Sequence, residues 1–185
     1  MSSVIPLAAG RSPREALSTL RDVRECLIVH DSNRGANWAR NRGAELAQGE
    51  FLLFSDDDIR WKPRAVDLMR KTLRDYPNAA FCYGSYMMDG QLYCRERFNA
   101  KLLRERNYIS TMSLIRSSAF PGFDESIRRL QDWDLWLTML EHGHVGVHCG
   151  LVIFETTKHD GISFGPNAMP WEEADMIVRR KHGLA

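Results

Sequence analysis

The chain has 185 residues, of which 44% are hydrophobic and 26% are charged, and its formal net charge is +1. This length and balance favour one globular domain, and they exclude a disordered or strongly acidic protein. A net charge near zero gives no general attraction to nucleic acid, so we expect no nucleic-acid partner.

The cysteines and the apolar runs indicate in which cellular compartment the protein is expected. The four cysteines, at positions 26, 82, 94 and 149, have no C-x-x-C spacing. We therefore expect neither a zinc site nor a disulfide framework. The first 15 residues have no basic stretch before an apolar one, and no run approaches the roughly 20 apolar residues of a membrane span. These features predict a cytoplasmic protein that does not span a membrane, although its substrate can be membrane-bound.

Short apolar runs alternate with helical patterns through the first half of the chain. Strands are expected at residues 4–7, 26–29, 51–54 and 79–83, and helices at 13–21, 36–48 and 64–75. The run 51–54 is apolar at every position, which predicts a central strand that is buried on both faces. This alternation is typical of an α/β domain with a largely parallel sheet.

The second half is more mixed. Strands are expected at residues 91–97, 108–115 and 145–154, and helices at 131–142 and 171–182. Residues 155–169 are rich in Gly, Pro and Thr and are expected to form a loop.

Three consecutive carboxylates, Asp56, Asp57 and Asp58, come just after the central strand. In open α/β sheets, ligands bind beyond the carboxyl ends of the strands. Carboxylate oxygens suit hard cations such as Mg²⁺ and Mn²⁺, which commonly bridge to substrate phosphates. The cluster alone supports two readings equally: a metal and diphosphate site, or a surface turn whose side chains cap the next helix.

The context of these acids favours the first reading. Residues 49–63, GEFLLFSDDDIRWKP, resemble the D-x-D segment of family 2 glycosyltransferases, which have the GT-A fold. In that family the motif binds a divalent metal together with the ribose and diphosphate of the donor. The resemblance implies that Asp56 and Asp58 bind Mn²⁺ or Mg²⁺. It also implies that Asp56 and Asp57 contact the donor nucleotide or its diphosphate.

An arginine-rich segment precedes the acids. Residues 33–43, NRGANWARNRG, look like the N-x-G-x-x-x-A-R-N-x-G segment of the same family. Gly35 permits a tight turn into a helix whose first amides can face an anion. Arg40 can bind a phosphate or a carboxylate through two hydrogen bonds, so it either contacts the donor nucleotide or supports the acids. Arg42 is expected on a solvated helix face.

A third segment supplies a candidate base. Residues 122–136, GFDESIRRLQDWDLW, are similar to the family signature G-F-D-E…(E/Q)-D-W-D-L-W. There an Asp at the start of the helix takes the proton from the acceptor hydroxyl, and by position this residue is Asp132. The alternative is that Asp132 and Asp134 are first-turn acids that complement the helix dipole. We favour catalysis for Asp132 and a supporting role for Asp134.

A histidine follows the last expected strand. Many GT-A enzymes place a His here as a further metal ligand, and His159 fits that position. A neutral imidazole suits Mn²⁺, but a lone loop His is equally well explained as a solvated side chain.

One part of the family pattern is missing. The family has a second strand that ends in an acidic turn for the nucleobase, then a helix, then a third strand that leads into N-x-G. Here residues 25–33 run straight into Gly35. They are either the second strand, which makes Asp31 the base-contacting acid, or the third strand. We expect a GT-A-type α/β fold with a mostly parallel central sheet flanked by helices, shortened by about one βα unit.

The chain is expected to form a single domain with three functional parts. Residues 1–98 form the nucleotide-binding half, residues 99–165 the acceptor and catalytic half, and residues 166–185 a C-terminal helix.

The leading hypothesis is an inverting glycosyltransferase. It moves a sugar from a nucleoside-diphosphate sugar, UDP-linked by preference, to a hydroxyl on a saccharide, a lipid-linked acceptor or another acceptor. Homo-oligomerisation is left open. The missing unit motivates a second hypothesis, a non-catalytic nucleotide- or carbohydrate-binding scaffold. A nucleotidyltransferase is a third, and residues 131–136 argue against it.

Overall fold

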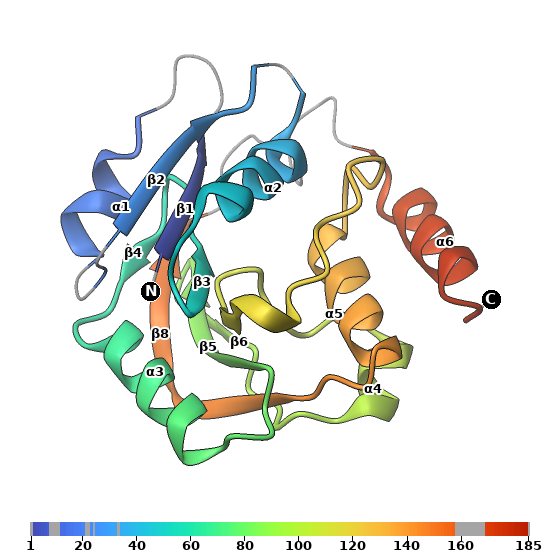
Figure 1. The fold of residues 1–185 in the computed structure, drawn as a ribbon. Helices are drawn as coiled ribbons and strands as arrows, with labels where there is room; N and C mark the ends of the chain where they lie inside the picture. The colour runs from blue at the N-terminus through green and yellow to red at the C-terminus, as the bar shows by residue number, and fades with distance from the viewer. Residues whose placement is uncertain are drawn as a thin grey trace.

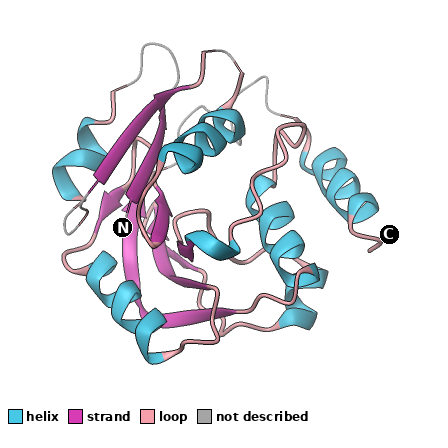
Figure 2. Cartoon of the chain, in the orientation of Figure 1, coloured by secondary structure: helices cyan, strands magenta, loops and turns pink. Residues whose placement is uncertain are grey.

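The computed structural model describes residues 2–7, 12–20, 23, 25–32, 34–157 and 169–184. Helices and strands alternate along this part of the chain (Figures 1 and 2). The strands are β1 (Ser2–Leu7), β2 (Glu25–His30), β3 (Phe51–Phe54), β4 (Arg60–Trp61), β5 (Phe81–Met88), β6 (Gln91–Tyr93), β7 (Leu114–Arg116) and β8 (Gly146–Thr156). The helices are α1 (Arg14–Thr19), α2 (Ala36–Leu46), α3 (Ala65–Asp75), α4 (Ala100–Glu105), α5 (Gln131–Glu141) and α6 (Trp171–Lys181), with a short 3₁₀ turn, η1 (Ser117–Ala119).

The described strands form one sheet in the order β2-β1-β3-β7-β5-β8-β4, and β6 pairs with β5. The strands β1, β2, β3, β5 and β8 run in one direction, and β4, β6 and β7 run in the other. The expected α/β fold with a mostly parallel central sheet is confirmed. β2 lies directly beside β1, and no other described strand lies outside it.

Both faces of the sheet are covered by apolar side chains. Along β3, Leu52 and Phe54 enter one core with Trp133 and Trp136 of α5. Phe51 and Leu53 enter a second core, on the opposite face, with side chains of α3. Successive strand residues point to opposite faces, so an unbroken apolar run is what a doubly covered strand requires. The sequence-based prediction for 51–54 is therefore confirmed in its bounds and in its burial.

Most of the other expected elements form near their expected bounds, but the strand expected at 91–97 ends at Tyr93, and β4 was not predicted. Residues 108–113 were expected in a strand but are irregular, and β7 begins only at Leu114. The reason is local bonding: the Ser113 amide donates to the Thr111 carbonyl at 2.7 Å, and the Ser113 hydroxyl donates to the Ser110 carbonyl at 2.7 Å. Such bonds compete with a β ladder. The helix α4 was not predicted, although its N-cap Asn99 is a readable signal.

Helix α2 lies close against β1 because a glycine faces the strand. A Cβ on Gly43 would overlap the side chain of Val4, which is fully buried. Ala39 is also buried on this face, whereas Leu46 is 64% exposed and does not join it. The small residues at 39 and 43 thus set the distance between α2 and the sheet.

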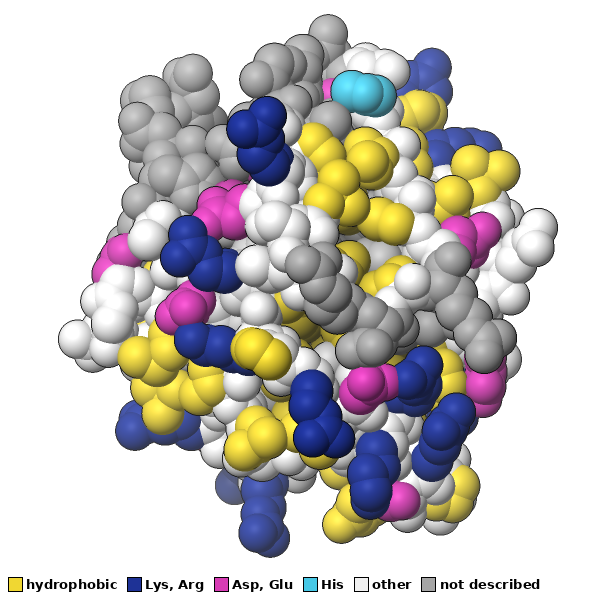
Figure 3. Space-filling model, turned by 90° about the vertical axis from the view of Figure 1, so that its left-hand side faces the viewer, with side chains coloured by type: hydrophobic (Ala, Val, Ile, Leu, Met, Phe, Trp, Pro, Cys, Tyr) yellow, Lys and Arg dark blue, Asp and Glu magenta, His cyan; other side chains and the backbone are white. Residues whose placement is uncertain are grey.

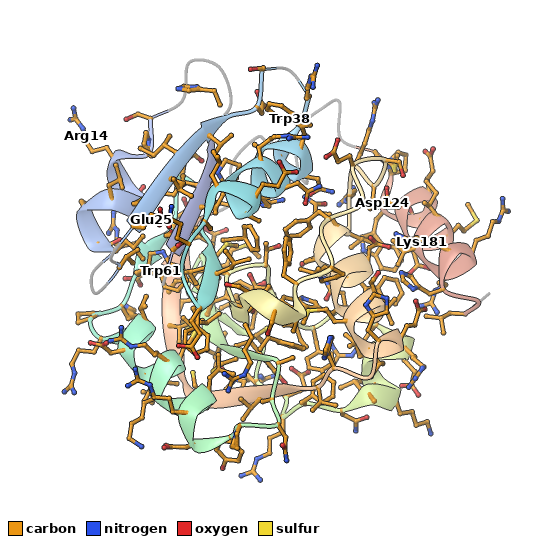
Figure 4. All side chains as sticks on the ribbon, in the orientation of Figure 1. Arg14, Glu25, Trp38, Trp61, Asp124 and Lys181 are labelled. Carbon is orange, nitrogen blue, oxygen red and sulfur yellow. The ribbon has the colours of Figure 1, made fainter. Side chains whose placement is uncertain are left out.

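The C-terminal helix α6 is held to the start of α5 by ionic contacts. Lys181 Nζ lies 2.7 Å from Asp134 and 2.8 Å from Asp124, and Figure 4 shows Asp124 and Lys181 facing one another. The ring of His182 contacts Asp134 through Nε2 at 2.9 Å and Glu141 through Nδ1 at 2.7 Å. Asp134, which is 2% exposed, therefore anchors the end of α6 to α5.

The side of the molecule that bears α1 and β2 carries exposed apolar side chains among its charges (Figure 3). Leu17 of α1 is 38% exposed and Ile28 of β2 is 42% exposed. No helix in the described ranges is both long enough and apolar enough to cross a bilayer.

We predict that Gly43→Ala destabilises the domain even though alanine favours helices. The new methyl group must displace the buried Val4 side chain, and overpacking of this kind costs about 1–3 kcal/mol. Urea denaturation followed by circular dichroism measures the loss. Glu45→Ala, at an exposed position of the same helix, is the control and should change the free energy of unfolding by less than about 0.5 kcal/mol. Equal effects of the two substitutions would show that close packing at position 43 is unimportant.

We predict that the docking of α6 weakens as the pH rises. Burial lowers the pKa of His182, but hydrogen bonds to Asp134 and Glu141 outweigh it, so the pKa lies above its ordinary value. A raised pKa gives stability that is complete below the pKa of the unfolded chain, about 6.5, and is lost as the pH rises through the folded value. Hydrogen exchange of the α6 amides across this range measures the effect. In His182→Asn the pH dependence should disappear, and its persistence would assign it to another group.

Candidate functional site

The aspartate turn begins at a fixed point at the end of β3. The Ser55 amide donates to the Val4 carbonyl at 3.0 Å, which continues the β1–β3 ladder past the strand. The Ser55 hydroxyl accepts a hydrogen bond from Trp61 Nε1 at 3.0 Å in the buried interior. Asp56 follows directly and is therefore held at the carboxyl end of β3, where ligands of α/β sheets bind.

A buried arginine lies beneath these acids. Arg40 is 3% exposed, and its Nη2 donates to Asp56 Oδ1 at 2.7 Å. Its Nη1 donates to the side-chain oxygen of Asn37 at 3.2 Å, and its guanidinium lies 5.3 Å from the centre of the Phe123 ring. Arg40 Nε has no hydrogen-bond partner among the described residues. The geometry supports a role in holding the acids rather than in direct contact with a nucleotide.

The arginine-rich segment also holds the loop that precedes α5. The Asn41 side chain accepts from the Phe123 amide at 2.8 Å and donates to the Phe123 carbonyl at 2.9 Å. Asn37 donates to the carbonyls of Asp124 and Ile127 at 2.8 and 3.0 Å. Sequence reasoning gave these asparagines no role. Their spacing of four residues on one helix face was the signal that could have revealed them.

Asp132 lies in the first turn of α5. Burial raises the pKa of Asp132, and a hydrogen bond from Asn107, the amide of Trp133 and the charge of Arg40 all oppose that rise. The Trp133 amide donates to Asp132 Oδ1 at 2.9 Å. Arg40 thus pairs directly with Asp56, and its charge also acts on Asp132, which links the expected base electrostatically to the aspartate turn. A carboxylate with a raised pKa is a better proton acceptor than an ordinary one.

Two tryptophans hold the base segment in place. Trp133 Nε1 donates to the Leu103 carbonyl at 2.7 Å, and Trp136 Nε1 donates to the Ile109 carbonyl at 2.9 Å. The Trp136 ring also stacks on Phe81 with centroids 4.4 Å apart. Just before α5, Leu130 has a φ of +59°, a left-handed conformation that is costly for a branched side chain. Tertiary packing therefore overrides the preference of Leu130 for a negative φ.

The remaining predicted site residues are located by the elements that they follow. Asp31 follows β2, and Asp57 and Asp58 lie in the turn after β3, so all three occupy the same edge of the sheet as Asp56. His159 lies outside the described residues. Within the described ranges, no three His, Cys, Asp or Glu side chains converge in a way that would hold a metal ion by themselves.

A cavity of about 410 Å³ opens directly on Asp132. Its walls include Tyr86 and Tyr93 of the β5–β6 hairpin, Arg95, and the segment that carries Asn107. A second cavity, of about 400 Å³, lies at the opposite edge of the sheet among Ser2, Glu25 and Arg70, away from the acids. The first cavity is the one that the site chemistry can use, because its wall contains the candidate base.

The sequence matches one family directly: the sequence profile described as glycosyl transferase family 2 matches residues 11–122. The chain belongs to this family. The match includes the arginine-rich segment and the aspartate turn, and it ends where the segment that leads to Asp132 begins.

Individual relatives extend this result. The chain is 29% identical over 143 residues to the putative colanic acid biosynthesis glycosyl transferase WcaA of Escherichia coli K12, covering 70% of this chain and 51% of WcaA. It is 24% identical over 139 residues to WfgD of Escherichia coli, a UDP-Glc:alpha-D-GlcNAc-diphosphoundecaprenol beta-1,3-glucosyltransferase, covering 71% of this chain and 54% of WfgD. The chain thus spans about half the length of these relatives.

The fold has a close counterpart among solved structures. TarS residues 1–349 of S. aureus, in complex with UDP-GlcNAc, superpose with a TM-score of 0.78 at 16% identity. The superposition covers 99% of this chain and 65% of that one. The GT-A-type fold that was expected from the sequence is confirmed.

We predict that Arg40→Met raises the pKa of Asp132 further, because it removes the cation that favours the ionised form. The same substitution removes the charge-assisted hydrogen bond to the part-exposed Asp56 and should lower the free energy of unfolding by about 1.5–3 kcal/mol. Carbon-13 NMR titration of the carboxyl groups and urea denaturation measure the two effects. Arg42→Met on the same helix, whose exposed partner is Glu45, is the matched control and should change stability by less than about 1 kcal/mol. The same Asp132 pKa in both variants would refute the role of Arg40.

Proposed function

We propose that this chain is the catalytic core of an inverting glycosyltransferase that uses a UDP-linked sugar and a hydroxyl acceptor. The observation that supports this most directly is that buried Arg40 pairs with Asp56 of the aspartate turn while its charge also acts on Asp132. Arg40 therefore couples the acids proposed to bind the diphosphate to the candidate base through its charge. The UDP-GlcNAc complex of TarS and the UDP-glucose donor in the name of WfgD support the choice of donor.

In this proposal the donor lies across the carboxyl ends of β1, β2 and β3. Asp31 contacts the nucleobase, and Asp56 and Asp57 face the ribose and diphosphate. Arg40 holds Asp56 in position from below, as its 3% exposure and 2.7 Å ion pair support. The side chains that contact the donor are thus supplied by the ends of parallel strands, and their support is supplied by α2.

The chemical step is a single displacement. Asp132 accepts the proton of the acceptor hydroxyl while that oxygen forms a bond to the anomeric carbon. The bond between the anomeric carbon and the diphosphate oxygen breaks, and the nucleoside diphosphate leaves with the electron pair. Attack from the face opposite the leaving group inverts the anomeric centre, so no covalent enzyme intermediate is needed.

The aspartate turn also suits a divalent cation, Mn²⁺ or Mg²⁺. Such cations are usually held by one or two carboxylates together with substrate phosphates, and not by a complete protein cage. Asp56 and Asp58 would hold the ion, with His159 as a further candidate ligand. When bound, the ion would neutralise charge on the departing diphosphate. Its identity, a cytoplasmic location and the oligomeric state remain predictions.

We predict that Asp132→Asn lowers the rate of sugar transfer by about 10²–10⁴-fold, because an amide cannot accept the proton. Binding of UDP should persist, since Asp132 is assigned to the acceptor and not to the nucleotide. Calorimetry with UDP and Mn²⁺ and product analysis by mass spectrometry measure the two properties. Asp75→Asn, at an exposed position of α3, is the matched control and should retain wild-type turnover.

The outcomes separate the proposed function from its alternative. Equal turnover in the Asp132 variant and the wild type would remove Asp132 from the mechanism. Binding of UDP by the wild-type chain without any transfer or donor hydrolysis would favour the non-catalytic binding domain. The position of β2 at the edge of the described sheet is the observation that keeps this alternative in view.

A further inference from the structure

The cavity beside Asp132 is lined by side chains that have no role in the proposed chemical step. It measures about 410 Å³, which is within the range of pockets that hold small molecules. Asp132 contributes the reacting carboxylate to its wall. The β5–β6 hairpin supplies an aromatic surface, and two arginines, Arg95 after the hairpin and Arg106 after α4, also line the wall. These groups indicate what kind of molecule the cavity selects.

The aromatic surface is the end of an ordered stack of rings. Tyr93 lies parallel to Tyr86, with centroids 5.3 Å apart and an angle of 14° between the rings. Tyr86 lies parallel to Phe154, with a centroid distance of 4.7 Å and an angle of 6°. Phe154 in turn contacts the buried Trp61. A stack anchored in the core gives the cavity a flat and rigid wall, against which the C–H groups of a sugar ring can pack.

The charges of the cavity leave one cation uncompensated. Arg106 Nη2 lies 2.5 Å from Glu96 Oε1, so these two charges neutralise one another. Asp132 has the charge of Arg40 near it. Arg95 lines the cavity and is exposed, and it forms no ion pair with any described residue. The cavity therefore presents a guanidinium that is available for an anion.

The chain is forced into an unusual conformation immediately before Arg95. Cys94 has a φ of +58°, in the left-handed region that non-glycine residues seldom adopt. Its carbonyl accepts a hydrogen bond from the Ser85 hydroxyl at 3.0 Å and lies 2.9 Å from His148 Nε2. The Gly150 amide donates to His148 Nδ1 at 2.9 Å, so the ring proton is on Nε2 and points at the Cys94 carbonyl. Strain that is held by several hydrogen bonds fixes the direction in which the chain enters Arg95.

From these observations we propose that the cavity is an acceptor subsite for a sugar that carries an anionic group, either a carboxylate or a phosphate. Tyr93 packs against the sugar ring, Arg95 binds the anion, and the acceptor hydroxyl points at Asp132. Ser85 and His148 are positioning residues, because they act through Cys94. This inference rests on the proposed function and adds the chemical class of the acceptor to it.

The test compares three ligands in calorimetric titrations of the whole chain with UDP and Mn²⁺ present. The anionic ligands are methyl β-D-glucuronide, which carries a carboxylate, and glucose 1-phosphate, which carries a phosphate. Methyl β-D-glucoside is the neutral control. We expect at least one anionic ligand to bind about tenfold more tightly than the neutral one, as a charge-assisted hydrogen bond allows. The ligand that binds better identifies the anion as a carboxylate or a phosphate.

Three substitutions test which side chains cause the tighter binding of the anionic ligands. Arg95→Gln should bring the ratio of the anionic and neutral dissociation constants close to one. Arg97→Gln, an exposed arginine two residues further on that does not line the cavity, is the matched control and should keep the ratio. Tyr93→Leu should weaken all three ligands together, because the ring contacts the sugar and not the anion.

Equal affinity of the wild-type chain for all three ligands would overturn the inference. So would equal loss of the preference in the Arg95 and Arg97 variants. The proposed function is tested separately, by UDP binding and by release of sugar from the donor in water. A chain that binds and hydrolyses the donor but ignores the anion contradicts the inference alone, and a chain that does not bind the donor contradicts the proposed function.

Discussion

The ion pair between the buried Arg40 and the part-exposed Asp56 is the constraint on which the rest of the site depends. A guanidinium that is 3% exposed is stable only if its charge and its N–H groups are largely satisfied. Asp56, Asn37 and the Phe123 ring supply most of what it needs, and they come from the aspartate turn, from α2 and from the loop before α5. Segments far apart in the sequence must therefore meet at one point before the charge can be buried.

The parts of the fold and of the site that could be predicted are those that local sequence determines. The run 51–54 specified its strand fully, because a strand with two buried faces needs an unbroken apolar run. The helix at 131–141 was predicted to within one residue, because its tryptophans and leucines repeat at helical spacing. Both properties are written in local sequence. The position of Asp56 at a strand end followed from the same reasoning.

What could not be predicted depends on contacts between distant segments. The sequence left open whether Arg40 contacts a nucleotide or the acids, since a guanidinium suits both, and only its burial separates them. The irregular path of residues 108–113 depends on turn-type hydrogen bonds that replace a ladder. No sequence pattern singled out Tyr93 and Arg95, because only the fold places them in the wall of the same cavity as Asp132.

Two strained residues have a left-handed backbone at a side chain that disfavours it: Cys94, in the cavity wall, and Leu130, two residues before Asp132. Neither segment would keep this shape as an isolated peptide, because the bonds that hold Cys94 come from β5 and β8. The cavity therefore cannot be transplanted by grafting its loops onto another scaffold. Its geometry is a property of the cooperatively folded domain, and it is lost when the domain unfolds.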